Sequence, residues 1–178
     1  MGGKSGVVYW DTSAFLALLK GEDTHGDGVL EALVSQAGAF DRGAIILATS
    51  TVGIMEVLSS NISEGLCEKF EGMVRRSNFQ TVTASETVAR KAAHLRKHCY
   101  VRGQTNGDAT HILSPADALH VASAMLLDAE ILVTLDSKNK GGKKEMAMTA
   151  VTNHYPLPGL KSVPIQRPAL GQPGTGLF

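Results

Sequence analysis

Apolar residues recur along the chain with two periods, and each change of period marks a boundary between a predicted strand and a predicted helix. Apolar or alternating runs predict strands at residues 7–10, 44–48, 79–83 and 131–135, with a last edge strand at 149–152. Helical spacing predicts helices at residues 14–20, 29–40, about 52–75, 85–101 and 115–128. Strands that alternate with helices predict an α/β fold of three layers, α/β/α, with a central parallel sheet of four to five strands.

Hydroxyl residues stand where several of the predicted helices begin. Thr12 or Ser13 is expected to cap the first helix, and residues 49–51 supply cap candidates for the helix that follows the second strand. The Ser-Pro pair at 114–115 is typical of a helix start, because proline fits the first helical turn. These caps place the beginning of each helix next to the end of a strand or loop.

The chain has the size of one domain. Its 178 residues are 43% apolar and 19% charged, a balance typical of a globular protein with one buried core. Five of the six prolines fall in residues 155–178, where no period is sustained. We therefore expect a folded domain over residues 1–152 and a Pro/Gly-rich tail or surface strap over residues 153–178.

Several classes of protein are disfavoured by composition. Lysine plus arginine equals aspartate plus glutamate at 17 each, so a polyanion would have to bind a local basic patch. Cys67 and Cys99 are interpreted as free thiols, and neither they nor His111 and His120 show zinc-type spacing. No apolar run approaches the roughly 20 residues of a membrane-spanning helix, and no signal peptide is recognised. The sequence thus predicts a cytoplasmic protein with no membrane contact.

Four acidic residues stand out by their positions. Asp11 and Asp136 come directly after predicted strands, and ligands of parallel α/β sheets bind at the carboxyl ends of strands. Glu56 lies on an otherwise apolar helix, where a glutamate is unexpected. Asp117 lies in the first turn of its helix, where the helix dipole alone also accounts for an acid.

Four carboxylates in one small volume repel one another, so such a cluster needs cations or shared protons. Mg²⁺ and Mn²⁺ prefer oxygen ligands, activate water and stabilise the charge of a phosphodiester under attack. A catalytic metal site built from Asp11, Glu56, Asp117 and Asp136 therefore predicts a hydrolase that acts on nucleic acid.

The order of these motifs also resembles the PIN-domain family. Residues 8–19, in which apolar residues precede Asp-Thr-Ser and an apolar helix, are similar to the opening strand and helix of that family. Residues 114–124 resemble its third acidic motif, and residues 131–136 resemble the strand that leads to its fourth. With Glu56 in the second motif, the resemblance spans roughly residues 7–140.

This resemblance implies an endoribonuclease dependent on Mg²⁺ or Mn²⁺ that hydrolyses RNA phosphodiester bonds. It implies that Asp11 and Asp117 are the main metal ligands, and that Glu56 and Asp136 complete the acidic pocket and position the metal-bound water. These four carboxylates are therefore assigned as both catalytic and metal-binding residues.

Two hydroxyl residues are assigned supporting roles by the same resemblance. Ser13 matches a small hydroxyl residue near the family's metal site, and Thr134 is expected to orient the acidic cluster. The chain departs from the family after Asp136, where an aromatic residue often follows but residues 137–140 read Ser-Lys-Asn-Lys. Contacts beside the fourth carboxylate are therefore expected to differ from those of the family.

A basic segment follows the fourth carboxylate. Lys138, Lys140, Lys143 and Lys144 fall within seven residues in a glycine-containing loop. A solvated loop explains them, but a cationic patch here would also offset the repulsion between the carboxylates and an RNA backbone. Both interpretations stay open, and the second assigns these lysines to RNA binding.

The size of the chain resembles the toxin half of VapC-type toxin–antitoxin pairs. Such toxins are typically held inactive by a small antitoxin protein that occludes the acidic site, and they commonly form homodimers. The resemblance therefore implies RNA as substrate, with a small antitoxin and a second copy of the chain as possible partners.

Two other functions remain open at the level of sequence. A phosphohydrolase of the haloacid dehalogenase type also begins with an aspartate after a strand, but it needs a second aspartate two residues later, where this chain has Ser13. A non-catalytic binding module with the same PIN fold is the other alternative. It would be favoured if any of the four carboxylates pointed away from the common pocket.

Overall fold

The computed structural model describes residues 6–105, 111–138, 145–151 and 161–175 of the chain. Within these residues five parallel strands form one sheet, in the order β3-β2-β1-β4-β5. The strands are β1 (Val7–Trp10), β2 (Ile46–Ser50), β3 (Phe79–Val82), β4 (Ile131–Val133) and β5 (Ile165–Gln166). Because all pairs are parallel, the carboxyl ends of the strands share one edge of the sheet.

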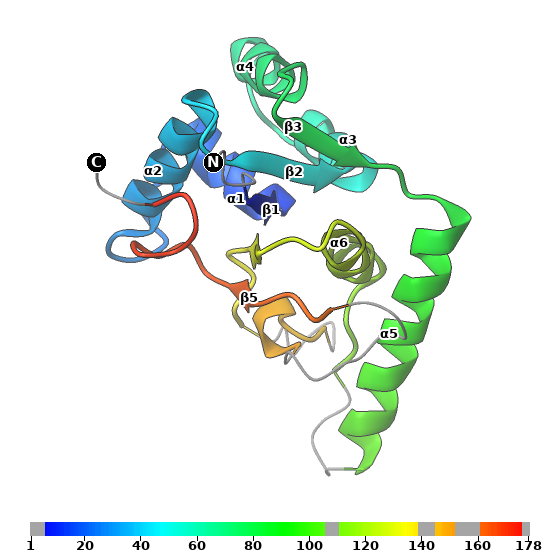
Figure 1. The fold of residues 1–178 in the computed structure, drawn as a ribbon. Helices are drawn as coiled ribbons and strands as arrows, with labels where there is room; N and C mark the ends of the chain where they lie inside the picture. The colour runs from blue at the N-terminus through cyan, green and yellow to red at the C-terminus, as the bar shows by residue number, and fades with distance from the viewer. Residues whose placement is uncertain (1–5, 106–110, 139–144, 152–160, 176–178) are drawn as a thin grey trace, which may run out of the picture.

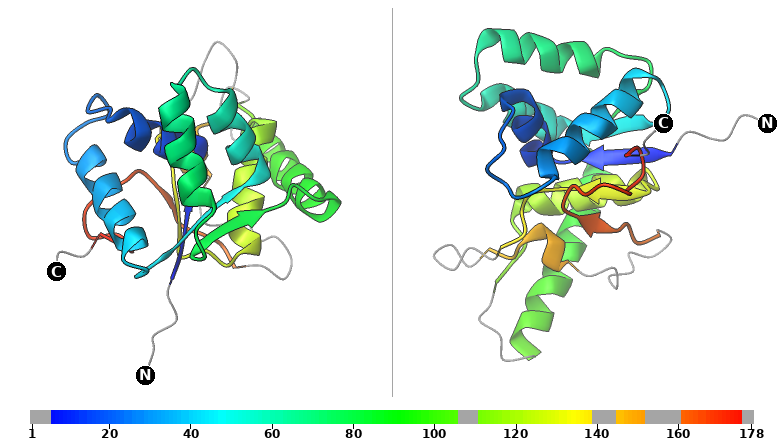
Figure 2. Two further views of the ribbon diagram at one scale, coloured as in Figure 1. Left: turned by 90° about the horizontal axis from the view of Figure 1, so that it is seen from above. Right: turned by 90° about the vertical axis from the view of Figure 1, so that its left-hand side faces the viewer.

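Helices cover both faces of this sheet (Figure 1). In the view from above in Figure 2, α2 lies on one side of β1, and α5 and α6 lie on the other. The predicted three-layer fold with a parallel sheet of four to five strands is thus confirmed. The helices are α1 (Thr12–Lys20), α2 (Val29–Asp41), α3 (Thr51–Ser59), α4 (Glu64–Val74), α5 (Glu86–Thr105) and α6 (Pro115–Leu126).

The central strand β1 is buried on both faces. Val8 and Trp10 pack into the apolar cluster formed with α1, α2 and α4, whereas Tyr9 packs into the cluster formed with α5 and α6. All three side chains are fully buried, as expected when successive side chains of an interior strand point to opposite faces. The residue that follows β1 is Asp11, so the strand delivers this carboxylate to the edge of the sheet from the middle of the core.

Several predicted boundaries are wrong in detail. The second strand runs from Ile46 to Ser50 instead of over residues 44–48, because its pairing with β1 begins at Ile46. The single helix predicted for residues 52–75 is two helices, α3 and α4, separated by residues 60–63. The first helix is capped by the Asp11 side chain, which accepts from the Ala14 amide, and not by Thr12 or Ser13.

The outer strand of the sheet comes from an unexpected part of the chain. Met148–Ala150 forms a single 3₁₀ turn, so the prediction of an edge strand at 149–151 is wrong; Thr152 lies outside the described residues. The strand beside β4 is β5, from the segment predicted as a tail or strap. Val163, just before β5, and Thr175, farther along the same segment, are also buried. The division of the chain at residue 152 stays a prediction.

The other properties expected from composition are seen only in part. Cys67 is a free, partly buried thiol as predicted, and the Cys99 side chain lies outside the described residues. None of the helices in the described part of the chain is both long and apolar enough to cross a membrane.

A buried glutamine joins the C-terminal segment to the core. Gln36 of α2 is fully buried; its Oε1 accepts from Trp10 Nε1 at 2.8 Å, and its Nε2 donates to the Pro173 carbonyl at 2.9 Å. The C-terminal segment accordingly lies beside α2 in Figure 1. One amide side chain therefore satisfies both a buried indole N–H and a backbone carbonyl.

Replacing this glutamine by methionine tests how much the link contributes. Gln36→Met keeps a similar volume but leaves the Trp10 indole and the Pro173 carbonyl unpaired, so we expect the free energy of unfolding to fall by about 1–3 kcal/mol. Gln80→Met, on the exposed side of β3, is the matched control and should change stability by less than about 0.5 kcal/mol. Urea denaturation measures both, and equal midpoints for the two variants would contradict the assignment.

Candidate active site at the carboxyl end of the sheet

Asp11 is the most buried of the four predicted carboxylates, with 5% of its surface exposed. Its Oδ1 accepts from the Ser13 hydroxyl at 2.6 Å and the Ala14 amide at 3.1 Å, and its Oδ2 accepts from the Thr134 hydroxyl at 2.7 Å. Burial raises the pKa of Asp11, against the opposing effects of His120 and these donors. Three donors therefore fix the position of a carboxyl group whose pKa stays raised because the effect of burial is the larger one.

The two hydroxyls that hold Asp11 also bind the chain after β4. Ser13 Oγ accepts from the Leu135 amide at 2.8 Å, and Thr134 Oγ1 accepts from the Asp136 amide at 2.9 Å. Each hydroxyl thus donates to Asp11 and accepts from the segment that carries Asp136. This geometry gives both predicted supporting residues a place in the site, in which they tie its two aspartates to one another.

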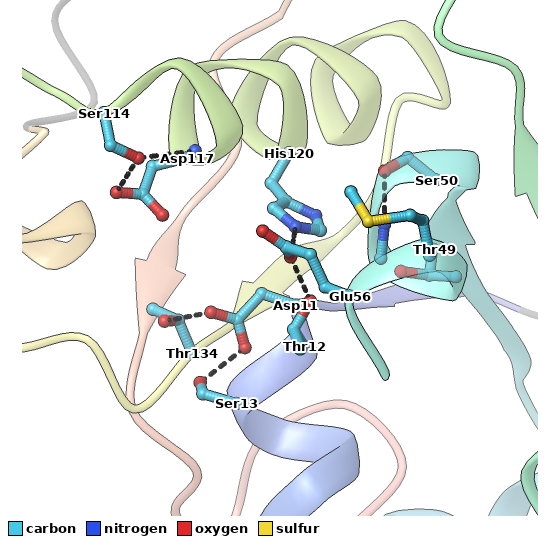
Figure 3. Close-up of polar contacts among 12 residues, drawn as sticks. Asp11, Thr12, Ser13, Thr49, Ser50, Glu56, Ser114, Asp117, His120 and Thr134 are labelled. Atoms are coloured by element: carbon cyan, nitrogen blue, oxygen red, sulfur yellow. Dashed lines mark hydrogen bonds and ion pairs between the residues drawn. The ribbon is translucent and has the colours of Figure 1, made fainter. Parts of the chain in front are cut away.

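Glu56 is held by a chain of buried polar groups (Figure 3). Its Oε2 accepts from the Thr12 hydroxyl and lies 3.1 Å from His120 Nε2. His120 is 2% exposed, and its Nδ1 lies 2.9 Å from the Tyr9 hydroxyl. One neutral tautomer satisfies every group, with Tyr9 donating to Nδ1 and Nε2–H donating to Glu56.

These hydrogen-bonded side chains also affect one another's pKa values. Burial raises the pKa of Tyr9, so its hydroxyl keeps the proton that it donates. The hydrogen bond from His120, with a smaller contribution from Thr12, lowers the pKa of Glu56 despite partial burial. Glu56 is therefore ionised at neutral pH, with Oε2 doubly hydrogen-bonded and Oε1 turned toward Asp117 (Figure 3).

Gly53 allows α3, which carries Glu56, to approach α6, which carries His120. Gly53 lies in the first turn of α3, capped by the Ser50 hydroxyl at 3.2 Å. A Cβ at Gly53 would lie 3.1 Å from His120 Cε1 and would overlap the Thr49 hydroxyl. The absence of a side chain here brings α3 against α6 and so brings Glu56 to His120.

Asp117 occupies the first turn of α6. Ser114 caps this helix: its Oγ accepts from the Asp117 amide at 3.1 Å and donates to Asp117 Oδ2 at 2.6 Å. Burial raises the pKa of Asp117, and the negative charges of Asp136 and Asp11 raise it further. The carboxylate is therefore close enough to the other two aspartates to be repelled by both.

Asp136 lies at the rim of this cluster. Its Oδ2 accepts from the Met148 amide at 3.0 Å, and its carbonyl accepts from the Thr149 amide at 3.2 Å. The 3₁₀ turn that replaces the predicted edge strand thus holds the fourth carboxylate.

The carboxylates form an oxygen-donor set of the kind that hard divalent cations prefer. Figure 3 shows Asp11, Glu56 and Asp117 turned toward a common space between α6 and the end of β1. Among the described residues, however, no three such side chains lie near enough together to hold a metal ion as they stand. The donors fit a cation in chemical type: burial raises the pKa of both Asp11 and Asp117, the charges of Asp136 and Asp11 raise that of Asp117 further, and a bound cation would favour the ionised form of each.

Comparison with known proteins decides the family. The family model of the PIN domain matches residues 8–140. The chain belongs to the PIN-domain family. PIN domains are generally nucleases and typically use divalent metals. No curated protein matches the chain in sequence.

Solved structures with the same PIN fold include two from toxin–antitoxin systems. A chain in the crystal structure of VapBC2 from Rickettsia felis bound to a DNA fragment from their promoter matches with a TM-score of 0.53 and 14% identity, covering 90% of this chain and 98% of that one. A chain in a toxin–antitoxin complex from Klebsiella pneumoniae matches with a TM-score of 0.51 and 19% identity, covering 79% and 97%. At these identities the similarity shows a shared fold.

Two alternative functions were left open by the sequence. Membership in the PIN family removes the first, a phosphohydrolase of the haloacid dehalogenase type, because that hypothesis required a different family. The second alternative, a non-catalytic PIN module, was to be favoured by a carboxylate turned away from the pocket. Asp11, Glu56 and Asp117 are turned toward one space (Figure 3), which does not favour it, whereas Asp136 is bonded to the Met148 amide and also lines the adjacent pocket, so this alternative stays open.

Sequence reasoning undervalued one member of this PIN site and missed two others. The spacing of His120 in the sequence excludes only a zinc site, whereas in the structure its Nε2 lies 3.1 Å from Glu56 Oε2 and its ring faces the Tyr9 ring edge-on at a centroid distance of 5.9 Å. Its position three residues after Asp117 places both on one side of α6, which was a usable indication. Tyr9 and Thr12 gave no such indication, because their partners lie on other elements.

The basic segment is only partly described. Lys138 is exposed beside Asp136, and Lys140, Lys143 and Lys144 lie outside the described residues. Their assignment to RNA binding stays a prediction.

The burial of Asp117 and its repulsion by two aspartates have a measurable consequence for stability. Its folded-state pKa lies above the ordinary value of 3.8, so in the absence of metal this group's contribution to stability falls as the pH rises from 3.8 through the folded-state pKa. Asp117→Asn keeps the hydrogen bond with Ser114 and removes the charge. We therefore expect this variant, in chelator at pH 7, to melt about 2–4 °C above the wild type, the shift that roughly 1 kcal/mol produces in a domain of this size.

Thermal melts across a pH series measure this effect. The gain should shrink as the pH approaches 3.8, where the wild-type carboxyl is protonated as well. Asp41→Asn, an exposed change on α2, should give no comparable gain. A variant that melts lower than the wild type at pH 7 would show that the Asp117 charge stabilises the metal-free fold.

Proposed function

We propose that this PIN domain is a Mg²⁺- or Mn²⁺-dependent endoribonuclease that hydrolyses RNA phosphodiester bonds at the four carboxylates. The observation that carries the proposal is the buried Asp11 carboxylate, fixed by three donors at the end of the central strand and close enough to Asp117 to raise its pKa. Burying and crowding negative charge in this way costs stability unless a cation binds there.

Each carboxylate has a role in the proposed reaction that follows from its surroundings. Asp11 and Asp117 would hold the cation, and Asp136 would complete the acidic pocket. The bound cation would activate a water molecule and stabilise the charge that develops on the phosphodiester. Ser13 and Thr134 keep Asp11 in one rotamer, so the ligand is placed before the cation arrives.

Glu56 is proposed to orient the attacking water. Its Oε2 is occupied by Thr12 and His120, which leaves Oε1 as the acceptor that faces the common space (Figure 3). Because His120 keeps its pKa low, Glu56 stays ionised and able to accept a proton from water in hydrogen-bonding range. His120 and Tyr9 are positioning residues in this proposal, since they act through Glu56.

Catalysis is tested with purified protein and a fluorescently labelled single-stranded RNA. We expect cleavage with Mg²⁺ or Mn²⁺ and none in excess chelator. Asp11→Asn and Glu56→Gln should each lower the rate by at least about a hundredfold, since each removes a group that acts on the transition state. The matched controls Asp41→Asn and Glu86→Gln change exposed acids on α2 and α5 and should cleave as the wild type does.

Binding of the metal is measured separately from cleavage. Mn²⁺ should raise the melting temperature of the wild type and of Asp41→Asn, but not that of Asp11→Asn or Asp117→Asn. Cleavage at full rate in chelator, or equal stabilisation of all four proteins by Mn²⁺, would rule out the proposed centre.

We further propose that the chain is the toxin of a toxin–antitoxin pair. Two of the solved structures of similar fold come from such complexes, and this chain covers 97–98% of the matching chains. Met55, the residue before Glu56 on α3, is 56% exposed, so a partner seated on it would lie beside the acidic site. A homodimer stays a prediction, which size-exclusion chromatography with light scattering would test.

Growth measurements test the toxin assignment. Induced expression of the wild type in a bacterial host is expected to arrest growth, whereas Asp11→Asn, expressed to the same level, is not. Co-expression of a short DNA-binding protein encoded beside this chain should restore growth and yield a co-purifying complex. Unaffected growth at a level of soluble, RNA-cleaving protein would overturn the toxin role and leave the nuclease role intact.

A further inference from the structure

A second pocket opens beside the acidic site, on the far side of Asp136. It has a volume of about 380 Å³ and is lined by the loop after α1, the loop after β4 and the residue that follows β5. Asp136 belongs to both the pocket and the carboxylate cluster, since it lines the former and repels Asp117 in the latter. The two sites are therefore adjacent, with this carboxylate between them.

Arg167 forms one wall of this pocket. Its Nη1 donates to the Ser137 hydroxyl at 2.8 Å, and its Nη2 donates to the His25 carbonyl. These contacts fix the plane of a half-buried guanidinium, which carries three further N–H groups. A guanidinium held in this way suits a tetrahedral oxyanion, because little side-chain freedom remains to be lost on binding.

Both cations and acids surround the pocket. Lys138, which is exposed, lines it together with Arg167, so that two cations stand beside the Asp136 carboxylate. The loop after α1 adds further acids: Glu22, which pairs with His25 at 2.8 Å and Lys20 at 3.5 Å, and the exposed Asp23 and Asp27. An anion would therefore be held by the fixed donors of Arg167, not by an overall positive field.

We infer that Arg167 and Lys138 form a subsite for a backbone phosphate of the RNA strand, next to the phosphate that is cleaved at the carboxylates. The inference rests on the proposed nuclease function. It adds to that function a second contact with the RNA backbone, outside the carboxylate cluster. Arg167 lies beyond residues 8–140, the part of the chain that matches the PIN family. Arg167 thus comes from the C-terminal segment, which β5 docks onto the sheet, whereas Lys138 lies within the matched part.

Binding is measured by fluorescence anisotropy with a labelled single-stranded RNA, in chelator and in an Asp11→Asn background, so that cleavage plays no part. Arg167→Gln and Lys138→Gln should each weaken binding about tenfold, as expected for loss of one charged phosphate contact. Each should also make the dependence of log affinity on log salt concentration shallower by about 0.7. Arg90→Gln, on exposed α5, is the control and should leave affinity and salt dependence unchanged.

Arg167→Lys separates charge from structure, because it keeps the cation and loses the two-point attachment to Ser137 and His25. The subsite predicts that it binds RNA several-fold more tightly than Arg167→Gln. Equal weakening in both Arg167 variants, with melting temperatures lowered alike, would show that Arg167 only braces the loops. Affinity of Arg167→Gln equal to that of Arg90→Gln would also overturn the subsite.

The binding experiment tests the subsite separately from the nuclease proposal. If RNA binding depends on Arg167 but the protein with Asp11 intact cleaves no RNA, the nuclease proposal fails and the phosphate subsite stands. If that protein cleaves RNA and Arg167→Gln changes neither the affinity nor KM, the subsite fails and the nuclease proposal stands.

Discussion

The site depends on one buried carboxylate at the end of the central strand. β1 is flanked by β2 and β4 and packed on both faces, so Asp11 leaves the core at a fixed point and direction. The same side chain caps α1 and accepts from Thr134 in the loop after β4. One residue therefore joins a strand, a helix and a neighbouring loop. A substitution there changes the geometry of the fold's edge as well as its charge.

The other carboxylates are arranged around this point by polar groups that are themselves buried. Tyr9 projects from the opposite face of β1 to Trp10, reaches His120 on α6, and through it orients Glu56 on α3. The result is an ionised glutamate beside two aspartates whose pKa values are raised by burial, and for Asp117 also by like charge. This contrast is what a centre built for a hard cation and an oriented water requires.

The C-terminal segment is part of the folded structure around the site. Its strand accepts a hydrogen bond from the Thr134 amide, the residue whose hydroxyl holds Asp11. Gln36 anchors the same segment to Trp10, and Arg167 connects it to the loops beside Asp136. Positions far apart in sequence thus share the support of one carboxylate and the wall of the adjacent pocket.

The sequence alone determined the layered fold and identified the four carboxylates as candidates for the site. Periodicity is a local property, and Asp11 and Asp136 were recognisable because each follows an apolar run directly. Only the tertiary structure decided that β5 pairs with β4, that Gly53 lets α3 approach α6, and that His120 and Tyr9 orient Glu56. Each of these is a contact between elements that are distant in the chain. The strand Ile165–Gln166 is only two residues long, so it shows no periodicity in the sequence. Nothing in the sequence around the buried His120 indicates which residues it will contact.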